Sequence, residues 1–389
     1  MFGGKRRATP PQAPRAILAI KCFGFGSILQ MCPMLAALKE AHPDARITLL
    51  TFAQNAGAAR LLPMIDDVAT VEFRKGILVF LAETIRQILR LRRQRFDIIF
   101  DCEFFSYYVA LITRLLRTTH TVCIGFFNNR RVRDWIFTHM IAIDVSQHIS
   151  RLFLKMLAPL GVPATYRPLS ECGIRPRPEA LARVDALLES ERLRADDLLV
   201  VANVNASDLC PNRRWPLGHF ERLIREMLSA EPYGAHLVVA LIGAGEESGY
   251  VDGLARRFPD RRVHNLAGHL SIEELAALLR RAVLFIGNDS GPLHLAVACG
   301  IPTVSFFGPE TPRLYGPVGE HHRVFYRELH CSPCLNLFYS KDTRCTNNVC
   351  LKTISPEDVF PVVDDLLRRA PAQRAGAGEA LEGASCSES

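Results

Sequence analysis

The sequence lacks a long apolar run. None of its apolar stretches approaches the roughly 20 residues that a helix needs to cross a bilayer, so we expect no transmembrane segment. The apolar stretch 16–20 follows a basic, proline-rich start, but it is too short for the core of a secretory signal. These absences lead us to expect a cytoplasmic protein.

Acidic residues are sparse in the first half of the chain. Residues 1–180 contain 25 Lys and Arg but only 13 Asp and Glu, whereas the remainder contains 22 and 27. A basic half suits an anionic partner, such as a phosphorylated glycolipid or the acidic face of a membrane. A solvated basic surface without a partner is the alternative. We expect no nucleic-acid partner.

A disulfide scaffold is not expected, although the chain has 12 cysteines, because thiols stay reduced in the cytoplasm. Four of them cluster with the spacing Cys331-x2-Cys334-x10-Cys345-x4-Cys350. Four cysteines at such spacing are able to hold a tetrahedral metal, either zinc or iron. Reduced thiols in a loop are the competing interpretation.

The third glycine of a dinucleotide-binding loop is also absent. Gly24-x-Gly26 follows an apolar run, but Leu29 stands where the third glycine is needed. We therefore reject a nicotinamide-dependent dehydrogenase.

What the chain does contain is a repeated alternation of strand and helix patterns. Its 389 residues, 49% of them apolar, suffice for two hydrophobic cores. The pattern indicates an α/β protein with doubly wound, mostly parallel sheets. The predicted strands are residues 15–22, 47–52, 71–73, 98–101, 122–124, 198–203, 237–242, 263–266, 283–286 and 303–307.

The Pro-rich stretch 163–178 marks a domain boundary. We predict domains at 15–175 and 176–369, a disordered arm at 1–14 and a disordered tail at 370–389, because both end segments lack an apolar period. Helices are predicted at 28–41, 76–95, 293–299 and 355–367.

The stretch 283–309 organises the second domain. A buried strand leads into the turn residues Asn288 to Gly291, and Pro292 suits the first position of the helix that follows. A second buried strand, 301–307, completes a β-turn-α-β unit. The helix N-terminus presents free amides and partial positive charge, which favours binding of a phosphate. In most α/β proteins, however, such turns hold only water.

Several separate motifs resemble the donor-binding signature of family 9 glycosyltransferases, the bacterial lipopolysaccharide heptosyltransferases and their relatives. They are Asn265-Leu-Ala-Gly268, Asn288-Asp-Ser-Gly-Pro-Leu-His-Leu-Ala296, Phe307-Gly-Pro309 and Gly316-Pro317. The resemblance implies a GT-B fold with two facing Rossmann-like domains, in which the last helix crosses back to the first. It implies inverting transfer of a heptose or similar sugar from a nucleotide diphosphate, ADP-heptose, to a glycan or glycolipid. No cofactor is implied for the transfer, and some members bind metal through cysteines placed like the four above.

The resemblance also assigns residues to the donor. Asp289 is placed at the sugar side, although it would also serve as a helix cap, and Arg213 stands where the family has a lysine that reaches the diphosphate. An arginine keeps the charge and adds a planar fork. Glu246, chosen over Glu247, resembles the glutamate that contacts the ribose. The remaining donor-side residues are Ser290, Gly291, Pro292, Leu293 and His294, together with Gly24 and Gly26 of the first loop.

The acceptor side departs from the family pattern. Ser27 stands where the family has its catalytic Asp, and a serine hydroxyl is a poor base unless another group takes its proton. Asp101 at the end of a strand is the best-placed substitute, and Glu103 is next. Two alternatives stay open: another acceptor, as in protein O-heptosylation, or a catalytically silent GT-B protein that only binds.

Arginines crowd the helical patterns of the first domain. The segment 76–95 is amphipathic and basic, and the segments 104–117 and 126–143 mix aromatic residues with arginine. Such a surface is able to rest in a lipid headgroup region, which would make the protein peripheral on the inner face of the membrane. A merely solvated face is the alternative.

Overall fold

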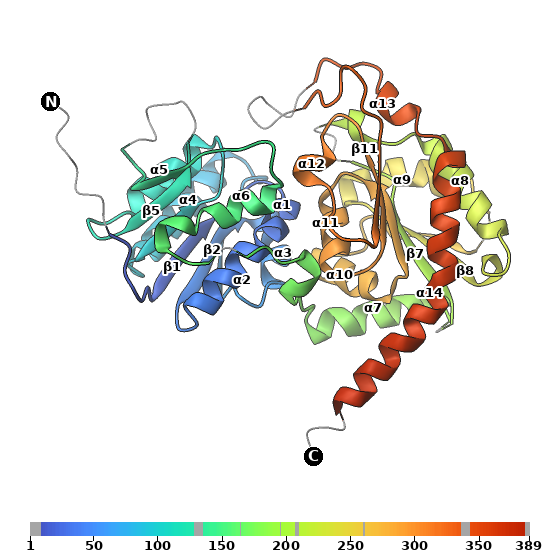
Figure 1. The fold of residues 1–389 in the computed structure, drawn as a ribbon, viewed down its shortest axis with the longest axis horizontal. Coiled ribbons are helices and arrows are strands. Elements are labelled where there is room, and N and C mark those ends of the chain that lie inside the picture. Colours follow the sequence, from blue (N-terminus) through green and yellow to red (C-terminus); the bar gives the residue numbers. More distant parts are fainter. Residues whose placement is uncertain are drawn as a thin grey trace. The chain divides into compact units, whose positions relative to one another are not determined.

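The chain forms two compact α/β units (Figure 1). The computed structural model describes residues 9–127, 135–163, 165–194, 196–206, 210–259, 261–335 and 343–385. The first unit ends at Arg175 and also takes in Arg313–Tyr315; the rest of the chain from Pro176 onward forms the second.

The first unit contains a six-stranded parallel sheet in the order β3-β2-β1-β4-β5-β6. Its strands are β1 Ala16–Ile20, β2 Arg46–Phe52, β3 Asp67–Val71, β4 Ile98–Asp101, β5 Val122–Phe126 and β6 His139–Ile141. Its helices are α1 Phe25–Gln30, α2 Cys32–Ala41, α3 Ala56–Arg60, α4 Ile77–Arg92, α5 Tyr107–Leu116 and α6 Ile149–Lys155.

The second unit repeats this arrangement with the order β12-β11-β10-β7-β8-β9. Its strands are β7 Leu198–Asn203, β8 Leu237–Leu241, β9 Val263–Asn265, β10 Leu284–Asn288, β11 Thr303–Phe307 and β12 His322–Tyr326. Its helices are α7 Pro178–Ser190, α8 Leu217–Ser229, α9 Ser248–Ala255, α10 Ile272–Arg281, α11 Gly291–Ala298, α13 Val349–Lys352 and α14 Pro356–Ser385. The short α12, Pro312–Tyr315, lies where the division between the units falls.

Each sheet has a point where the chain reverses its direction of winding. In the first unit this point lies between β1 and β4, where Ile20 pairs with Asp101. In the second it lies between β7 and β10, where Asn203 pairs with Gly287. Ligands of open α/β sheets bind outside the carboxyl ends of the strands at such points. The loops after these four strands are therefore the places to look for a site.

The predicted class of fold, doubly wound α/β, is confirmed. The buried strands β4, β7 and β11 have the predicted bounds, because both their faces are covered and they appear as continuous apolar runs. The edge strands β6 and β12 were missed, since their residues are mostly half-exposed. The predicted helix 28–41 is instead two helices, α1 and α2, with a proline in the first turn of the second.

The C-terminal segment differs from the expectation, whereas the N-terminal arm lies mostly outside the described residues. Residues 1–8 of the predicted arm lie outside the described residues. The tail was predicted to be disordered from residue 370, but α14 continues to Ser385, because its Ala, Glu, Gln and Arg residues favour a helix. The first turns of α14 pack on α8 within the second unit through Val359, Val363 and Leu367. Its crossing to the first domain stays a prediction.

No helix in the described ranges combines the length and the apolar character that crossing a bilayer requires.

Candidate functional site

The turn between β10 and α11 is bonded to the loop after β7. The hydroxyl of Ser290 accepts a hydrogen bond from Asn203 Nδ2 at 2.9 Å and donates to the carbonyl of Asn288 at 3.0 Å. The side chain of Asn288 in turn accepts from the amide of Trp215 at 2.8 Å and donates to the carbonyl of Asn205 at 3.1 Å. A network of hydrogen bonds between side chains and backbone therefore fixes the start of α11 at the carboxyl edge of the sheet.

The N-terminus of α11 carries no acidic residue in its first turn and has no side-chain cap. Ser290 is the N-cap residue, but its hydroxyl is engaged with Asn203 and Asn288 instead of the helix amides. Gly291, Pro292 and Leu293 form the first turn, and the side chain of His294 is buried behind them. An uncapped helix start with this composition favours an anionic ligand.

Arg213 and Asp289 form a buried ion pair beside this helix start. Nη2 of Arg213 lies 2.6 Å from Oδ2 of Asp289 and also 2.6 Å from its carbonyl oxygen. The side chains are only 16% and 5% exposed. Burial works to lower the pKa of Arg213, but the Asp289 carboxylate and its hydrogen bond outweigh burial, so the pKa is raised and the guanidinium stays charged. The pair thus holds a fixed positive group near the amides of α11.

Trp215 anchors the segment that carries Arg213. Its ring is fully buried, lies 4.1 Å from the ring of Phe306 in β11 in a stacked arrangement, and donates from Nε1 to the carbonyl of Ile354 at 2.9 Å. The next residue, Pro216, begins the turn into α8. An arginine two residues before such an anchor has little freedom to move, which explains why Arg213 can be held against Asp289.

The loop after β8 contributes Glu246 and Glu247, and the structure distinguishes them. Glu247 Oε2 accepts a hydrogen bond from the amide of Ala244 at 2.9 Å, so this carboxylate closes its own loop. Glu246 is exposed in the same loop. The side chain of Arg214 lies over the ring of Tyr250, 4.5 Å from its centroid, and so borders the same region.

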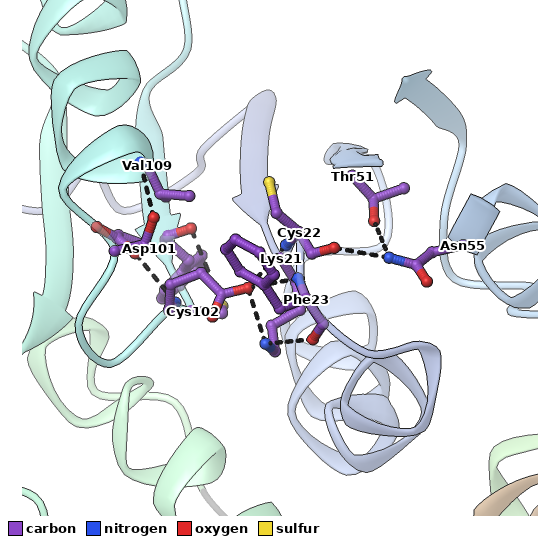
Figure 2. A network of polar contacts seen from close by, with 11 residues as sticks. Lys21, Cys22, Phe23, Thr51, Asn55, Asp101, Cys102 and Val109 are labelled. Carbon is purple, nitrogen blue, oxygen red and sulfur yellow. Dashed lines mark hydrogen bonds and ion pairs between the residues drawn. The ribbon is translucent and has the colours of Figure 1, made fainter. Parts of the chain in front are cut away.

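The corresponding edge of the first unit holds a second buried ion pair, between Glu103 and Lys21, the latter labelled in Figure 2. One oxygen of Glu103 accepts three hydrogen bonds, each of 2.8 Å, from Lys21 Nζ and from the amides of Cys22 and Phe23. Lys21 Nζ also donates to the carbonyl of Phe23 at 2.9 Å. These bonds tie the loop after β1 to the loop after β4.

Asp101 lies next to this pair as the last residue of β4. Its side chain is fully buried, and its Oδ1 accepts from the amide of Glu103 at 3.0 Å (Figure 2). Ser27 is partly exposed in α1, and its amide donates to the carbonyl of Gly24 at 3.0 Å. Gly24 has φ +75°, a conformation that favours glycine, whereas Gly26 is buried inside α1. The role of Asp101 as a base stays a prediction.

Sequence reasoning treated Asn288 only as part of the turn and the family signature, and it did not single out Asn203; both side chains bind the segments around the start of α11. Asn203 ends β7 and Asn288 ends β10, and both are buried with bonded side chains. A polar residue at the carboxyl end of an otherwise apolar strand is the signal that could have found them. Lys21 precedes the glycine loop, but its partner Glu103 lies 82 residues away, and no local pattern reveals that pairing.

Comparison with known proteins identifies the family. The model for glycosyltransferase family 9 (heptosyltransferase) matches residues 85–341. The chain belongs to this family. It is 25% identical over 346 residues to lipopolysaccharide heptosyltransferase 3 of Escherichia coli K12, covering 88% of this chain and 95% of that one.

Solved structures of this glycosyltransferase family share the fold. A family 9 glycosyl transferase from Veillonella parvula aligns with TM-score 0.74 and 21% identity over 92% of this chain and 98% of that one. The Escherichia coli heptosyltransferase WaaC with ADP aligns with TM-score 0.68 and 19% identity over 90% and 99%. The predicted glycosyltransferase family and its GT-B fold are therefore confirmed.

The four clustered cysteines lie in one neighbourhood of this glycosyltransferase. The pKa of Cys350 is raised to about 11, first by burial and then by the neighbouring Cys334, Cys345 and Cys331. Cys331 and Cys334 are exposed, however, and in the described part of the chain no three His, Cys, Asp or Glu side chains are arranged to hold a metal ion. The zinc or iron site that the spacing suggested therefore stays a prediction.

The Arg213–Asp289 pair gives a test of the donor-side geometry. Replacing Arg213→Ala leaves the buried Asp289 carboxylate without its cation, and we expect a loss of about 3–5 kcal/mol in the free energy of unfolding. The double variant Arg213→Met, Asp289→Leu removes both charges and should recover most of that loss, while donor binding stays weak. Urea denaturation and calorimetric titration with a nucleotide diphosphate measure the two effects.

The matched control is Arg281→Ala, which removes an arginine from an exposed pair with Asp185 in the same unit. Exposed pairs contribute little, so its stability should stay near that of the wild type. An Arg213→Ala protein as stable as this control would show that the buried pair does not hold the site together.

Proposed function

We propose that the protein transfers a heptose, with inversion, from ADP-heptose to a hydroxyl of the lipopolysaccharide core. The observation that carries the proposal is the uncapped start of α11 beside the buried, charged Arg213 at the carboxyl edge of β7 and β10. Family membership supports the reaction class, and the relatives named lipopolysaccharide heptosyltransferase support the sugar and the acceptor.

In this reaction the acceptor oxygen bonds to the anomeric carbon, and the bond from that carbon to the diphosphate breaks. Negative charge grows on the departing phosphate, while the acceptor hydroxyl loses its proton to a base. The amides at the start of α11 and the guanidinium of Arg213 would stabilise that charge. The hydrogen bonds of Asn288 fix the helix start and Asp289 holds the guanidinium, so these groups need no reorganisation in the transition state.

The positions of three further residues in the second unit support the roles that we propose for them in donor binding. Glu246, exposed in the loop after β8, would bind the ribose hydroxyls, and Asp289 would lie toward the sugar while holding Arg213. His294, buried in α11, would line the pocket. A lipid-linked acceptor would bring the enzyme to the inner face of the membrane, and this peripheral location is part of the proposal.

A donor and acceptor screen tests the function. The purified enzyme with ADP-heptose and a heptose-accepting core oligosaccharide should release ADP and give a product heavier by one heptose, measured by mass spectrometry. The Arg213→Met, Asp289→Leu variant should release ADP at least about 100-fold more slowly, in line with the loss of a key transition-state donor. Product on a protein acceptor instead would favour O-heptosylation, and no turnover of any donor would favour a binding role.

For the base we keep Asp101 as the proposed residue. Glu103 is less suited, because one of its oxygens already accepts three hydrogen bonds, which hold its side chain in place. Asp101 ends β4 next to the loop that carries Ser27 in the family's catalytic position. Its side chain is fully buried, so it would act through Ser27, through one water, or after the loop moves.

Asp101→Asn should therefore lower turnover by roughly 10²–10⁴-fold, the usual contribution of a general base, with nucleotide affinity nearly unchanged. Ser27→Asp should keep or raise turnover, because it restores a carboxylate where the family has one. Steady-state rates and ADP titrations measure both. Full turnover in Asp101→Asn would assign this residue a structural role.

A structural zinc or iron at the four cysteines stays a prediction. Its support is the shared neighbourhood of the thiols around Cys350. Elemental analysis of freshly purified protein should then find about one zinc or iron per chain, reduced by Cys331→Ser together with Cys334→Ser but not by Cys172→Ser at a buried thiol of the first unit. Absence of stoichiometric metal in the wild type would refute it.

A further inference from the structure

The first unit exposes an unusual number of large apolar side chains on α4 and α5. Of the 18 exposed large apolar residues in the described structure, ten lie between residues 73 and 115, and only three belong to the second unit. They include Leu78 at 79%, Ile85 and Leu89 at 58%, and Leu111 at 57% exposure. Monomeric proteins seldom expose contiguous apolar patches of this kind unless the patch binds something.

These residues form stripes on both helices. On α4, Leu78, Leu81, Ile85 and Leu89 follow at intervals of three and four residues, which places them on one side of the helix. On α5, Tyr107, Leu111 and Leu115 follow at intervals of four. Within α4 only Gln87 and Leu91 are buried, so the apolar stripe is separate from the side that packs on the core.

The two helices adjoin. The hydroxyl groups of Thr84 on α4 and Tyr108 on α5 lie 2.8 Å apart, and the ring of Phe80 lies 5.0 Å from that of Tyr108. Along the sequence, each exposed apolar residue of the two stripes lies within seven positions of Phe80, Thr84 or Tyr108. Near the end of α5, Arg117 donates to the carbonyls of Trp135 and Ile136, which brings the exposed Trp135 to the same region.

Positive charge surrounds this apolar surface. Residues 73–95 contain seven Arg and Lys but one acidic residue, Glu83. Glu83 pairs with Arg86, and Asp67 pairs with Arg90. Among the described residues, no carboxylate pairs with the other exposed cations at the ends of the helices, Lys75, Arg92, Arg93 and Arg114.

We propose that the apolar and basic surface of α4, α5 and Trp135, here called the α4–α5 surface, docks on an anionic lipid bilayer. Leucine, isoleucine and tryptophan side chains would enter the boundary between headgroups and acyl chains, and the arginines would contact lipid phosphates. A second copy of the chain fits less well, because it would bring the same unpaired arginines against this surface. The inference does not depend on the sugar donor, so vesicle binding can fail or succeed independently of the transferase activity.

Co-sedimentation with vesicles tests the proposal. The wild type should bind phosphatidylcholine vesicles containing phosphatidylglycerol, bind pure phosphatidylcholine vesicles much more weakly, and lose affinity as salt is raised. Ile85→Ser with Leu89→Ser should weaken binding to the anionic vesicles about tenfold or more, because two exposed apolar anchors are lost. Arg92→Gln with Arg93→Gln should weaken it about 30-fold, because about 1 kcal/mol per basic residue is lost.

The matched control replaces exposed residues of the second unit, Leu181→Ser with Arg256→Gln. It should bind vesicles like the wild type, and all variants should keep the wild-type melting temperature and ADP-heptose turnover on a soluble acceptor. Equal vesicle binding by the surface variants and the wild type would overturn the proposal. So would a wild-type oligomer that the surface variants convert to monomers without any change in vesicle binding, since the surface would then join copies of the chain.

Discussion

Each unit of the chain depends on a buried ion pair that connects its two central strands. Lys21 follows β1 and Glu103 follows β4, while Arg213 lies in the segment after β7 and Asp289 follows β10. A buried pair costs desolvation and is stable only if hydrogen bonds satisfy its remaining groups. Backbone groups do this here, through the amides of Cys22 and Phe23 in one unit and the carbonyl of Asp289 in the other. The loops that carry the sites are therefore fixed by charge as well as by packing.

The two pairs differ in what they leave for a ligand. In the first, the carboxylate is occupied by three donors, so the pair serves to shape the glycine loop. In the second, Nη2 of Arg213 is engaged on Asp289, but the guanidinium is a fork with five donors. A cation held on one side and adjacent to an uncapped helix suits a diphosphate better than a mobile lysine would. The second unit is accordingly the side we assign to the donor.

The sequence could predict those parts of the fold that depend on local pattern. β4, β7 and β11 are runs of buried residues between turn signals, and their bounds were predicted correctly. The glycine loop and the β10–α11 turn were also found, because glycine, proline and capping residues mark them. The ion pair that each of these segments makes within its own unit was not predictable, since Arg213 and Asp289 are 76 residues apart and Lys21 and Glu103 are 82 apart. Edge strands such as β12 were not predicted, because their half-exposed positions do not form a continuous apolar run.

The α4–α5 surface is another feature that the sequence alone does not predict. An amphipathic helix is expected to bury its apolar side and expose its arginines, yet α4 has apolar residues toward the core and away from it. The sequence alone does not show which apolar side of α4 is covered by other parts of the fold. The contact between Thr84 and Tyr108 places α5 beside α4 and so determines which side stays exposed. α5 begins at Tyr107, four residues after Glu103, so the exposed surface starts where the loop after β4 ends. A lipid-linked sugar acceptor held at that surface would therefore have a short path to the loop where the first unit places its charged residues.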